Sequence, residues 1–187
     1  RVKNFNIEEF KSHWEALEDG DHSPESLHIY LRTTAKTFSC IKKLNKKSAL
    51  KEYLDDNIQL WTHKASEKGL DNFTPCQTAE IFWSFAKLNI WPGHDFISKW
   101  GMAAGRFTDI RSDNSFTAQE ISKILYATCL FDAQNEDMDL SDTVSFLLDK
   151  MEEYAAWRKI NWQTYTDACR WIGKEPKFPL PQGTGTV

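Results

Sequence analysis

The sequence predicts an all-α fold, an α-solenoid of about three stacked helical hairpins with an N-terminal capping helix. One observation is an internal repeat: residues 73–89 read FTPCQTAEIFWSFAKLN and residues 116–132 read FTAQEISKILYATCLFD, 43 residues apart. Another is that apolar residues recur every three or four positions, which is helical periodicity, and strand-like alternation is missing. A period of this length is typical of helical units that each leave an apolar face for a neighbour to cover.

A short helix is expected within residues 1–22. Asn6 followed by Glu9 matches a capping box, in which two polar side chains satisfy free backbone amides at a helix start. Phe5 and Phe10 flank this cap as a hydrophobic staple, and Gly20 marks the expected end. We expect this helix to cap the front of the array.

The first hairpin is a degenerate copy of the repeat. Residues 43–45 (KLN) align with residues 87–89 (KLN), 44 residues later. Ser23 followed by Pro24 is expected to open the first helix of this copy, which then runs toward Leu44. A second, long helix is predicted over residues 48–69, with Ser48 as its cap.

Capping chemistry marks the first helices of the two central hairpins. Thr74 with Gln77, and Thr117 with Glu120, both match the capping box. Pro75 occupies the favoured first helical position. The second helices of these hairpins are predicted over residues 92–107 and residues 141–154.

The end of the chain contains a weaker repeat and a tail. Asn161 lies 44 residues after Thr117 and is suited to cap a further first helix. Residues 176–187 contain three prolines and two glycines without periodicity, which indicates a linker or flexible tail. The predicted domains are therefore the capping helix 1–22, the repeat domain 23–175 and the tail 176–187.

Composition limits the functional class. With 187 residues, 41% of them hydrophobic, the chain is long enough for one array with a continuous core, and two independent globular domains are not expected. A net charge of −4 is a poor match for a phosphate backbone overall, so local charge has to carry any nucleic-acid binding.

Cysteine usage indicates a reducing, intracellular compartment. The four cysteines show no CxxC pairing, which gives no support to a zinc knuckle or a disulfide scaffold. Organelle and cytoplasm are not distinguished, and delivery into a host cell stays an alternative. No apolar run approaches the roughly 18 residues that span a bilayer. Because the chain begins with Arg1 rather than Met, we expect it to be a piece of a longer protein.

The repeated phrases resemble helical repeats of the octotricopeptide and heptatricopeptide type, which also occur in FAST-kinase and RAP-domain proteins of organelles and in bacterial effector repeats. The resemblance covers roughly residues 28–175 and is strongest in the two central first helices. The matching residues are Phe73, Pro75, Trp83, Ala86, Lys87 and Leu88, then Phe116, Gln119, Tyr126, Ala127 and Leu130. The resemblance implies a solenoid and, for many members, RNA binding in which first helices face successive nucleotides. Its effector-like members imply protein targets instead.

Polar residues early on the first helices are the candidate base-reading groups, because unstacked RNA bases are read along their polar edges. They are Gln77, Glu80, Gln119 and Lys123, together with Arg32, Thr33 and Lys36 of the first copy. The alternative is that Gln77 and Glu120 only complete capping boxes and that the other side chains face water.

A dense basic cluster is the candidate phosphate contact. It consists of Lys42, Lys43, Lys46 and Lys47, where the first helix of the degenerate copy is expected to end. Cations at that position also favour the negative end of the helix dipole by a few tenths to about 1 kcal/mol. Phosphate contact and a dipole role therefore both stay open.

Tryptophans and glycines raise two further expectations. Most of the eight tryptophans, Trp83 among them, should be buried, whereas Trp91, in the turn before a proline, is the candidate for stacking on a base. Gly101 and Gly105 each cost about 1 kcal/mol in a helix interior, so we expect a neighbouring helix to approach them closely.

An enzyme is not expected. The sequence contains no GxSxG elbow, no phosphate-binding glycine loop and no HExxH helix, and the histidines are dispersed. We expect no catalytic residue, no metal and no cofactor. The sequence thus predicts a binding module for single-stranded RNA, with a protein-interaction scaffold as the alternative.

Overall fold

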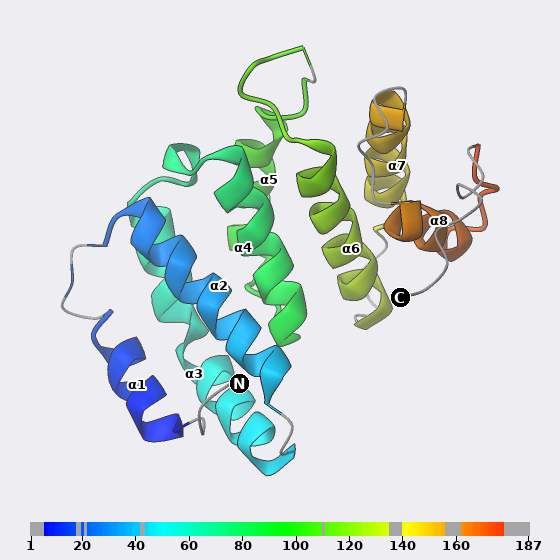
Figure 1. The fold of residues 1–187 in the computed structure, drawn as a ribbon. Coiled ribbons are helices and arrows are strands. Elements are labelled where there is room, and N and C mark those ends of the chain that lie inside the picture. The colour runs from blue at the N-terminus through cyan, green and yellow to red at the C-terminus, as the bar shows by residue number, and fades with distance from the viewer. Residues whose placement is uncertain are drawn as a thin grey trace. The chain divides into compact units, whose positions relative to one another are not determined.

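The computed structural model describes residues 6–17, 20, 22–41, 44–109, 111–134, 140–155 and 162–177. All regular secondary structure in these residues is helical, which confirms the predicted all-α class (Figure 1). The chain divides into two compact units, residues 1–106 and residues 107–187, which are described separately.

Unit 1 is formed by a front helix and two hairpins. Its elements are α1 (Ile7–Glu15), α2 (Pro24–Cys40), α3 (Leu44–Glu67), the 3-10 turn η1 (Leu70–Asn72), α4 (Pro75–Leu88) and α5 (His94–Gly105). Unit 2 contains α6 (Ala118–Gln134), α7 (Ser141–Ala155) and α8 (Trp162–Trp171). The further cap predicted at Asn161 lies outside the described residues.

The capping boxes predicted at Thr74 and Thr117 are present, whereas at Asn6 the side chain accepts from the Glu8 amide at 3.1 Å. The Thr74 amide donates to Oε1 of Gln77 at 2.9 Å, and the Gln77 amide donates to the Thr74 hydroxyl at 3.3 Å. Thr117 and Glu120 repeat this exchange at 2.7 and 3.3 Å. These hydrogen bonds satisfy amides that a helix start otherwise leaves unpaired, so the starts of α4 and α6 are fixed by local sequence.

The boundary inside the first hairpin differs from the prediction. Ser23 caps α2 as expected, but α2 ends at Cys40 and α3 begins at Leu44, ahead of the predicted cap Ser48. The backbone of Ile41 is extended, which stops α2 there. The alignment of residues 43–45 with residues 87–89 therefore matched the start of one helix with the end of another.

Each hairpin of unit 1 is held by the same hydrogen bond. The buried indole of Trp61 on α3 donates to the backbone oxygen of Leu27 on α2 at 2.9 Å. The indole of Trp100 on α5 donates to the backbone oxygen of Thr78 on α4 at 3.0 Å. Both carbonyls belong to the fourth residue after the helix cap, so the two hairpins repeat in structure as well as in sequence.

Aromatic rings fill the space behind these hydrogen bonds. Trp61 contacts Phe85 and Phe96 edge to face, with ring centroids 5.5 and 6.0 Å apart. Trp100 stacks on Phe82 at 4.3 Å. Trp61 therefore joins α3 of the first hairpin to both helices of the second, and the two hairpins share one core.

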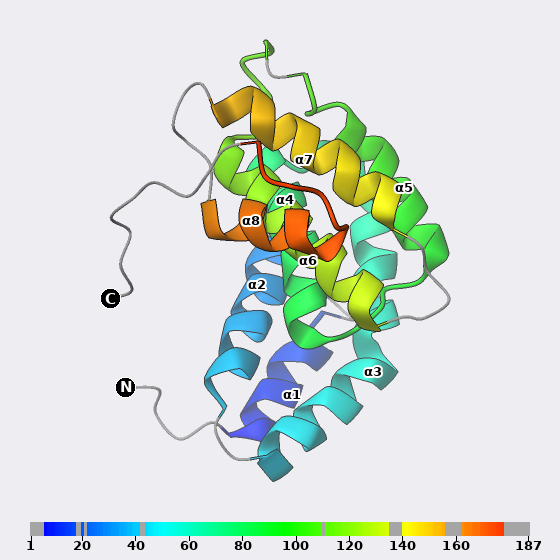
Figure 2. The same cartoon turned by 90° about the vertical axis from the view of Figure 1, so that its right-hand side faces the viewer.

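Helices α2 and α4 lie side by side and run in the same direction (Figures 1 and 2). The contact is fixed near the start of both helices, where Glu80 of α4 meets His28 and Arg32 of α2. First helices of successive hairpins are thus neighbours, and their outward residues lie on adjacent rows.

Unit 2 packs α7 and α8 against α6. The carboxylate of Asp132, near the end of α6, accepts from the Leu140 amide at 2.9 Å and from the Trp171 indole at 2.9 Å. One side chain thereby ties the start of α7 and the end of α8 to the same point of α6. The apolar core includes Ile124, Leu125, Phe131, Val144, Leu148, Met151 and Tyr165.

The expected close packing at Gly101 and Gly105 is wrong. Both glycines are exposed on α5, and a Cβ added at either would meet no atom within 4 Å outside the local helix backbone. Their helix cost is therefore not offset by a neighbouring backbone.

We predict that Gly101→Ala stabilises the protein by about 0.5–1 kcal/mol, because alanine lowers the entropy of the unfolded chain and has open space here. Urea unfolding followed by circular dichroism measures the change. Gly93→Ala is the matched control: Gly93 has a φ of 94°, a conformation that alanine adopts only with strain, so that variant should lose stability. A destabilised Gly101→Ala would contradict the open environment.

We predict that Trp61→Phe and Trp100→Phe each lower the free energy of unfolding by at least about 1–3 kcal/mol. Each change removes an indole N–H and leaves a buried backbone oxygen without its partner. Trp91→Phe, at a half-buried ring in a turn, should change stability by much less. Equal effects at all three positions would show that the two hydrogen bonds do not hold the hairpins.

Candidate functional site

Few side chains along α4 reach the surface, and those that do include an aromatic ring and a neighbouring cation. From Thr78 to Leu88, Trp83 and Lys87 alone are not buried. The Lys87 ammonium lies over the Trp83 ring, 5.6 Å from its centroid. The prediction that Trp83 is buried is therefore wrong, because the residue is only half-buried.

Arg32 and Lys36 of α2 continue this surface. Arg32 donates through Nε to the Glu80 carboxylate at 2.8 Å, and Glu80 lies one helical turn before Trp83. Lys36 is exposed one turn after Arg32 on the same face of α2. We call Arg32, Lys36, Trp83 and Lys87 the first-helix strip.

The strip positions recur on the first helix of unit 2. Counted from the helix caps, Lys123 and Tyr126 of α6 correspond to Glu80 and Trp83 of α4. Both α6 side chains are half-buried. A half-buried aromatic residue thus occupies the same position, counted from the cap, on α4 and on α6.

Local charge on the strip is positive although the chain is acidic. The strip carries three cationic side chains and one aromatic ring, and the Glu80 carboxylate that pairs with Arg32 is 9% exposed. Cations next to a ring that presents a face can bind a phosphate and stack a base together. This is the chemistry that the strip offers.

Among the predicted base-reading residues, Glu80 is the clear correction. It was expected on a free face, but it is 7% exposed and bonded to two residues of α2, because α4 is covered on that side by α2. Gln77 is half-buried, and its side-chain oxygen accepts the capping-box hydrogen bond from the Thr74 amide. Gln119 is exposed at the start of α6, as expected.

The predicted basic cluster lies elsewhere than expected. Lys46 and Lys47 belong to the first turn of α3, the positive end of that helix, so the expected stabilisation at a negative helix end is wrong for them. The Lys47 ammonium lies 4.6 Å from the Phe38 ring centroid, a cation–π contact that offsets part of this cost. Lys42 and Lys43 lie outside the described residues.

Trp91 is not fully exposed to solvent. It is half-buried, and its ring meets the ring of His94 edge to face at 5.4 Å. Among the described tryptophans, the largest exposure, 48%, belongs to Trp171, whose indole is bonded to Asp132. A stacking role for Trp91 stays a prediction.

Sequence reasoning missed Trp83 as a site residue although a signal was present. Lys87, which the sequence offered as an extension of the basic cluster, lies four residues after Trp83 and therefore on the same helix face. A lysine at that spacing could have shown that this face of α4 is not wholly a core face.

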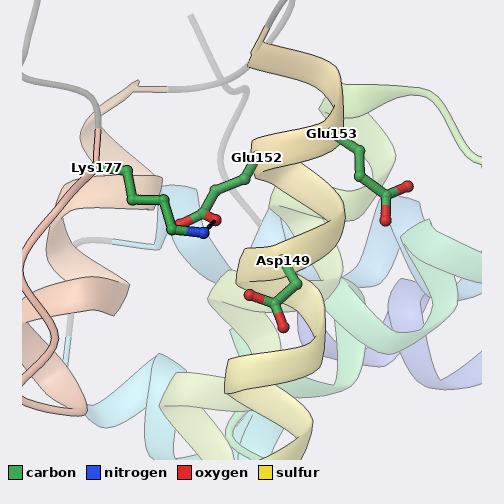
Figure 3. A pocket seen from close by; sticks show the side chains of 4 residues that line it. All are labelled: Asp149, Glu152, Glu153 and Lys177. Carbon is green, nitrogen blue, oxygen red and sulfur yellow. Dashed lines mark hydrogen bonds and ion pairs between the residues drawn. The ribbon is translucent and has the colours of Figure 1, made fainter.

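An open depression of about 550 Å³ lies in unit 2, lined by Asp149, Glu152 and Glu153 of α7 and by Lys177 (Figure 3). The Lys177 ammonium pairs with Glu152, whereas Glu153 points away from it. Glu152, 8% exposed, also accepts from the Tyr165 hydroxyl at 3.0 Å. The start of the predicted flexible tail is therefore held against α7 by the ion pair between Lys177 and Glu152. This ion pair accounts for acidic side chains in the lining of the depression.

Burial sets the ionisation of this unit's thiols and phenol. Burial, with a smaller effect of the Asp132 charge, raises the pKa of Cys129 to about 11. Burial also raises the pKa of Cys169 and of Tyr165. The hydrogen bond to Glu152 raises the pKa of Lys177. The thiols Cys129 and Cys169 are thus held in the protonated, unreactive form.

No cation site or membrane span emerges from the described residues. Among them, no three His, Cys, Asp or Glu side chains are placed to hold a metal ion together. None of the described helices is long and apolar enough to cross a bilayer. Comparison of the chain with protein-family models, with curated proteins and with solved structures returned no match.

We predict that stability falls as the pH rises from about 9 toward 11. In the unfolded chain Cys129 ionises near 9.0, but in the fold it keeps its proton to about 11, so unfolding releases a proton in this window and higher pH favours the unfolded state. Urea unfolding at about pH 8 and about pH 10 measures the loss. Cys129→Ala should lose less stability between these values, and an unchanged loss would contradict the assignment.

Proposed function

We propose that this protein is a helical-repeat module that binds single-stranded RNA along the first-helix strip. The observation that carries the proposal is the composition of the strip: one accessible tryptophan ring with Lys87 over it and with Arg32 and Lys36 on the neighbouring helix. Single-stranded nucleic acid is bound by this combination, since bases stack on aromatic rings while cations meet the backbone.

The proposal includes a solenoid arrangement of the octotricopeptide type. Two structural features of unit 1 support it: first helices run side by side in the same direction, and each hairpin repeats the tryptophan-to-carbonyl hydrogen bond at an equivalent position. In such an array the strip lengthens with each added repeat. Lys123 and Tyr126 occupy the equivalent positions on α6 of unit 2, with Gln119 before them.

The basic residues divide into two groups with different roles. Lys36 and Lys87 belong to the strip and are proposed to contact phosphates. Lys46 and Lys47 lie in the first turn of α3, off the strip, and Lys47 is engaged with Phe38. Their predicted phosphate role is therefore the weaker one.

A protein-interaction scaffold is the second candidate, favoured by one observation. Phe146 on α7 is 46% exposed, with the Lys150 ammonium 5.7 Å from its ring centroid and with Asp142 and Asp149 exposed one turn to either side. An exposed apolar ring with charges of both signs around it is typical of a protein-binding surface. This surface belongs to unit 2 and is separate in chemistry from the strip.

The charge test uses two variants with the same change in net charge. Lys36→Gln/Lys87→Gln should weaken binding to a mixed single-stranded RNA and reduce the salt slope of log affinity by about 1.4, since each lost phosphate contact removes about 0.7. Lys46→Gln/Lys47→Gln should change the slope by much less. Fluorescence anisotropy at several salt concentrations measures both.

Two outcomes would contradict the proposal. Equal losses in the two variants would show diffuse attraction rather than a strip. No binding by the wild-type protein even at low salt would end the RNA proposal and leave the scaffold function.

The stacking test addresses Trp83 alone. Trp83→Leu keeps an apolar side chain over the core but removes the ring face, and it should lower RNA affinity by about tenfold or more, since each stacked base contributes about 1–3 kcal/mol. Trp91→Leu is the control, because Trp91 packs on His94 and lies off the strip. If Trp83→Leu bound RNA with unchanged affinity and Trp91→Leu bound it more weakly, the stacking residue would be Trp91 rather than Trp83.

A further inference from the structure

Arg32 is held in one orientation by a buried carboxylate. Its Nε lies 2.8 Å from Oε2 of Glu80, and the same oxygen lies 2.8 Å from Nε2 of His28. Glu80 and His28 are 7% and 8% exposed, so the carboxylate and the imidazole are fixed between α2 and α4. His28 and Arg32 are one helical turn apart on α2, and both reach the single carboxylate on α4.

The rest of the guanidinium is available for a ligand. Nε takes the Glu80 bond, whereas the two terminal amino groups of Arg32 form no hydrogen bond or ion pair with any described residue. The side chain is 39% exposed. A guanidinium pinned at Nε presents its remaining donors as a planar fork, which matches two oxygens of one phosphate group.

We infer that Arg32 is a phosphate-binding residue of the first-helix strip and that Glu80, supported by His28, is its positioning residue. The inference rests on the proposed RNA function and names a phosphodiester group as what Arg32 recognises. Because Glu80 has already removed the rotational freedom of the guanidinium, phosphate binding does not have to order that side chain. Lysine cannot replace such a residue, since an ammonium has no fork.

A purely Coulombic role for Glu80 predicts the opposite result. If the carboxylate only lowered the local positive charge, Glu80→Gln would add one unit of positive charge and strengthen phosphate binding. Positioning predicts weaker binding despite the more favourable charge, because the neutral amide oxygen of glutamine holds the guanidinium less firmly than a carboxylate does. The sign of the change therefore separates the two roles.

The experiment is a double-mutant cycle on RNA affinity with Glu80→Gln, Arg32→Gln and the double variant. Arg32→Gln should weaken binding by about threefold or more, Glu80→Gln should also weaken it, and the double variant should be no weaker than Arg32→Gln alone. Glu25→Gln is the matched control: Glu25 is an exposed acid on α2, and its removal should slightly strengthen binding. Affinities are compared at a temperature where circular dichroism shows each variant folded.

Arg32→Lys is a second test that leaves Glu80 in place. It keeps the charge and should still bind RNA nearly as weakly as Arg32→Gln. Wild-type affinity in Arg32→Lys, additive losses in the cycle, or stronger binding by Glu80→Gln would each overturn the positioning inference while leaving RNA binding intact. Absence of wild-type binding would instead overturn the proposed function and this inference together.

Discussion

The buried Glu80 carboxylate between α2 and α4 is the constraint on which the rest of unit 1 depends. A carboxylate that is 7% exposed has to be paired, and its partners His28 and Arg32 lie on α2. Two parallel helices can slide along one another while apolar contacts are kept, but this pairing allows one register. The register then decides which outward side chains become neighbours, and it places Arg32 beside the row of Trp83.

Local interactions and tertiary interactions each determine a different feature of that surface. Capping boxes set where α4 and α6 begin, so residues counted from the cap hold equivalent positions along the two helices. The indoles of Trp61 and Trp100 then fix each second helix to the fourth residue of its first helix. The proposed function depends on what remains outside: an aromatic ring and three cations on a chain whose net charge is −4.

The sequence allowed the helical class and the caps Ser23, Thr74 and Thr117 to be predicted, because these depend on local chemistry. The predictions from sequence were wrong where packing against a neighbouring helix determines whether a residue is buried. Glu80 looked like a surface acid, and only the presence of α2 buries it. Gly101 seemed to require a packing partner, yet its surroundings are open. Lys46 was assigned to the end of a helix because the alignment of the two KLN segments did not reveal that α2 stops before Ile41. The strip depends on the register of α2 against α4, which no single repeat encodes.

Ultraviolet cross-linking of a mixed single-stranded RNA, followed by mass spectrometry of the cross-linked peptides, tests the central claim most directly. Aromatic rings that stack on bases are the expected sites of cross-linking. The account predicts adducts in peptides that contain Trp83 and Tyr126, at equivalent positions of two first helices. Adducts confined to α7 or to the turn at Trp91, with none on the first helices, would contradict it.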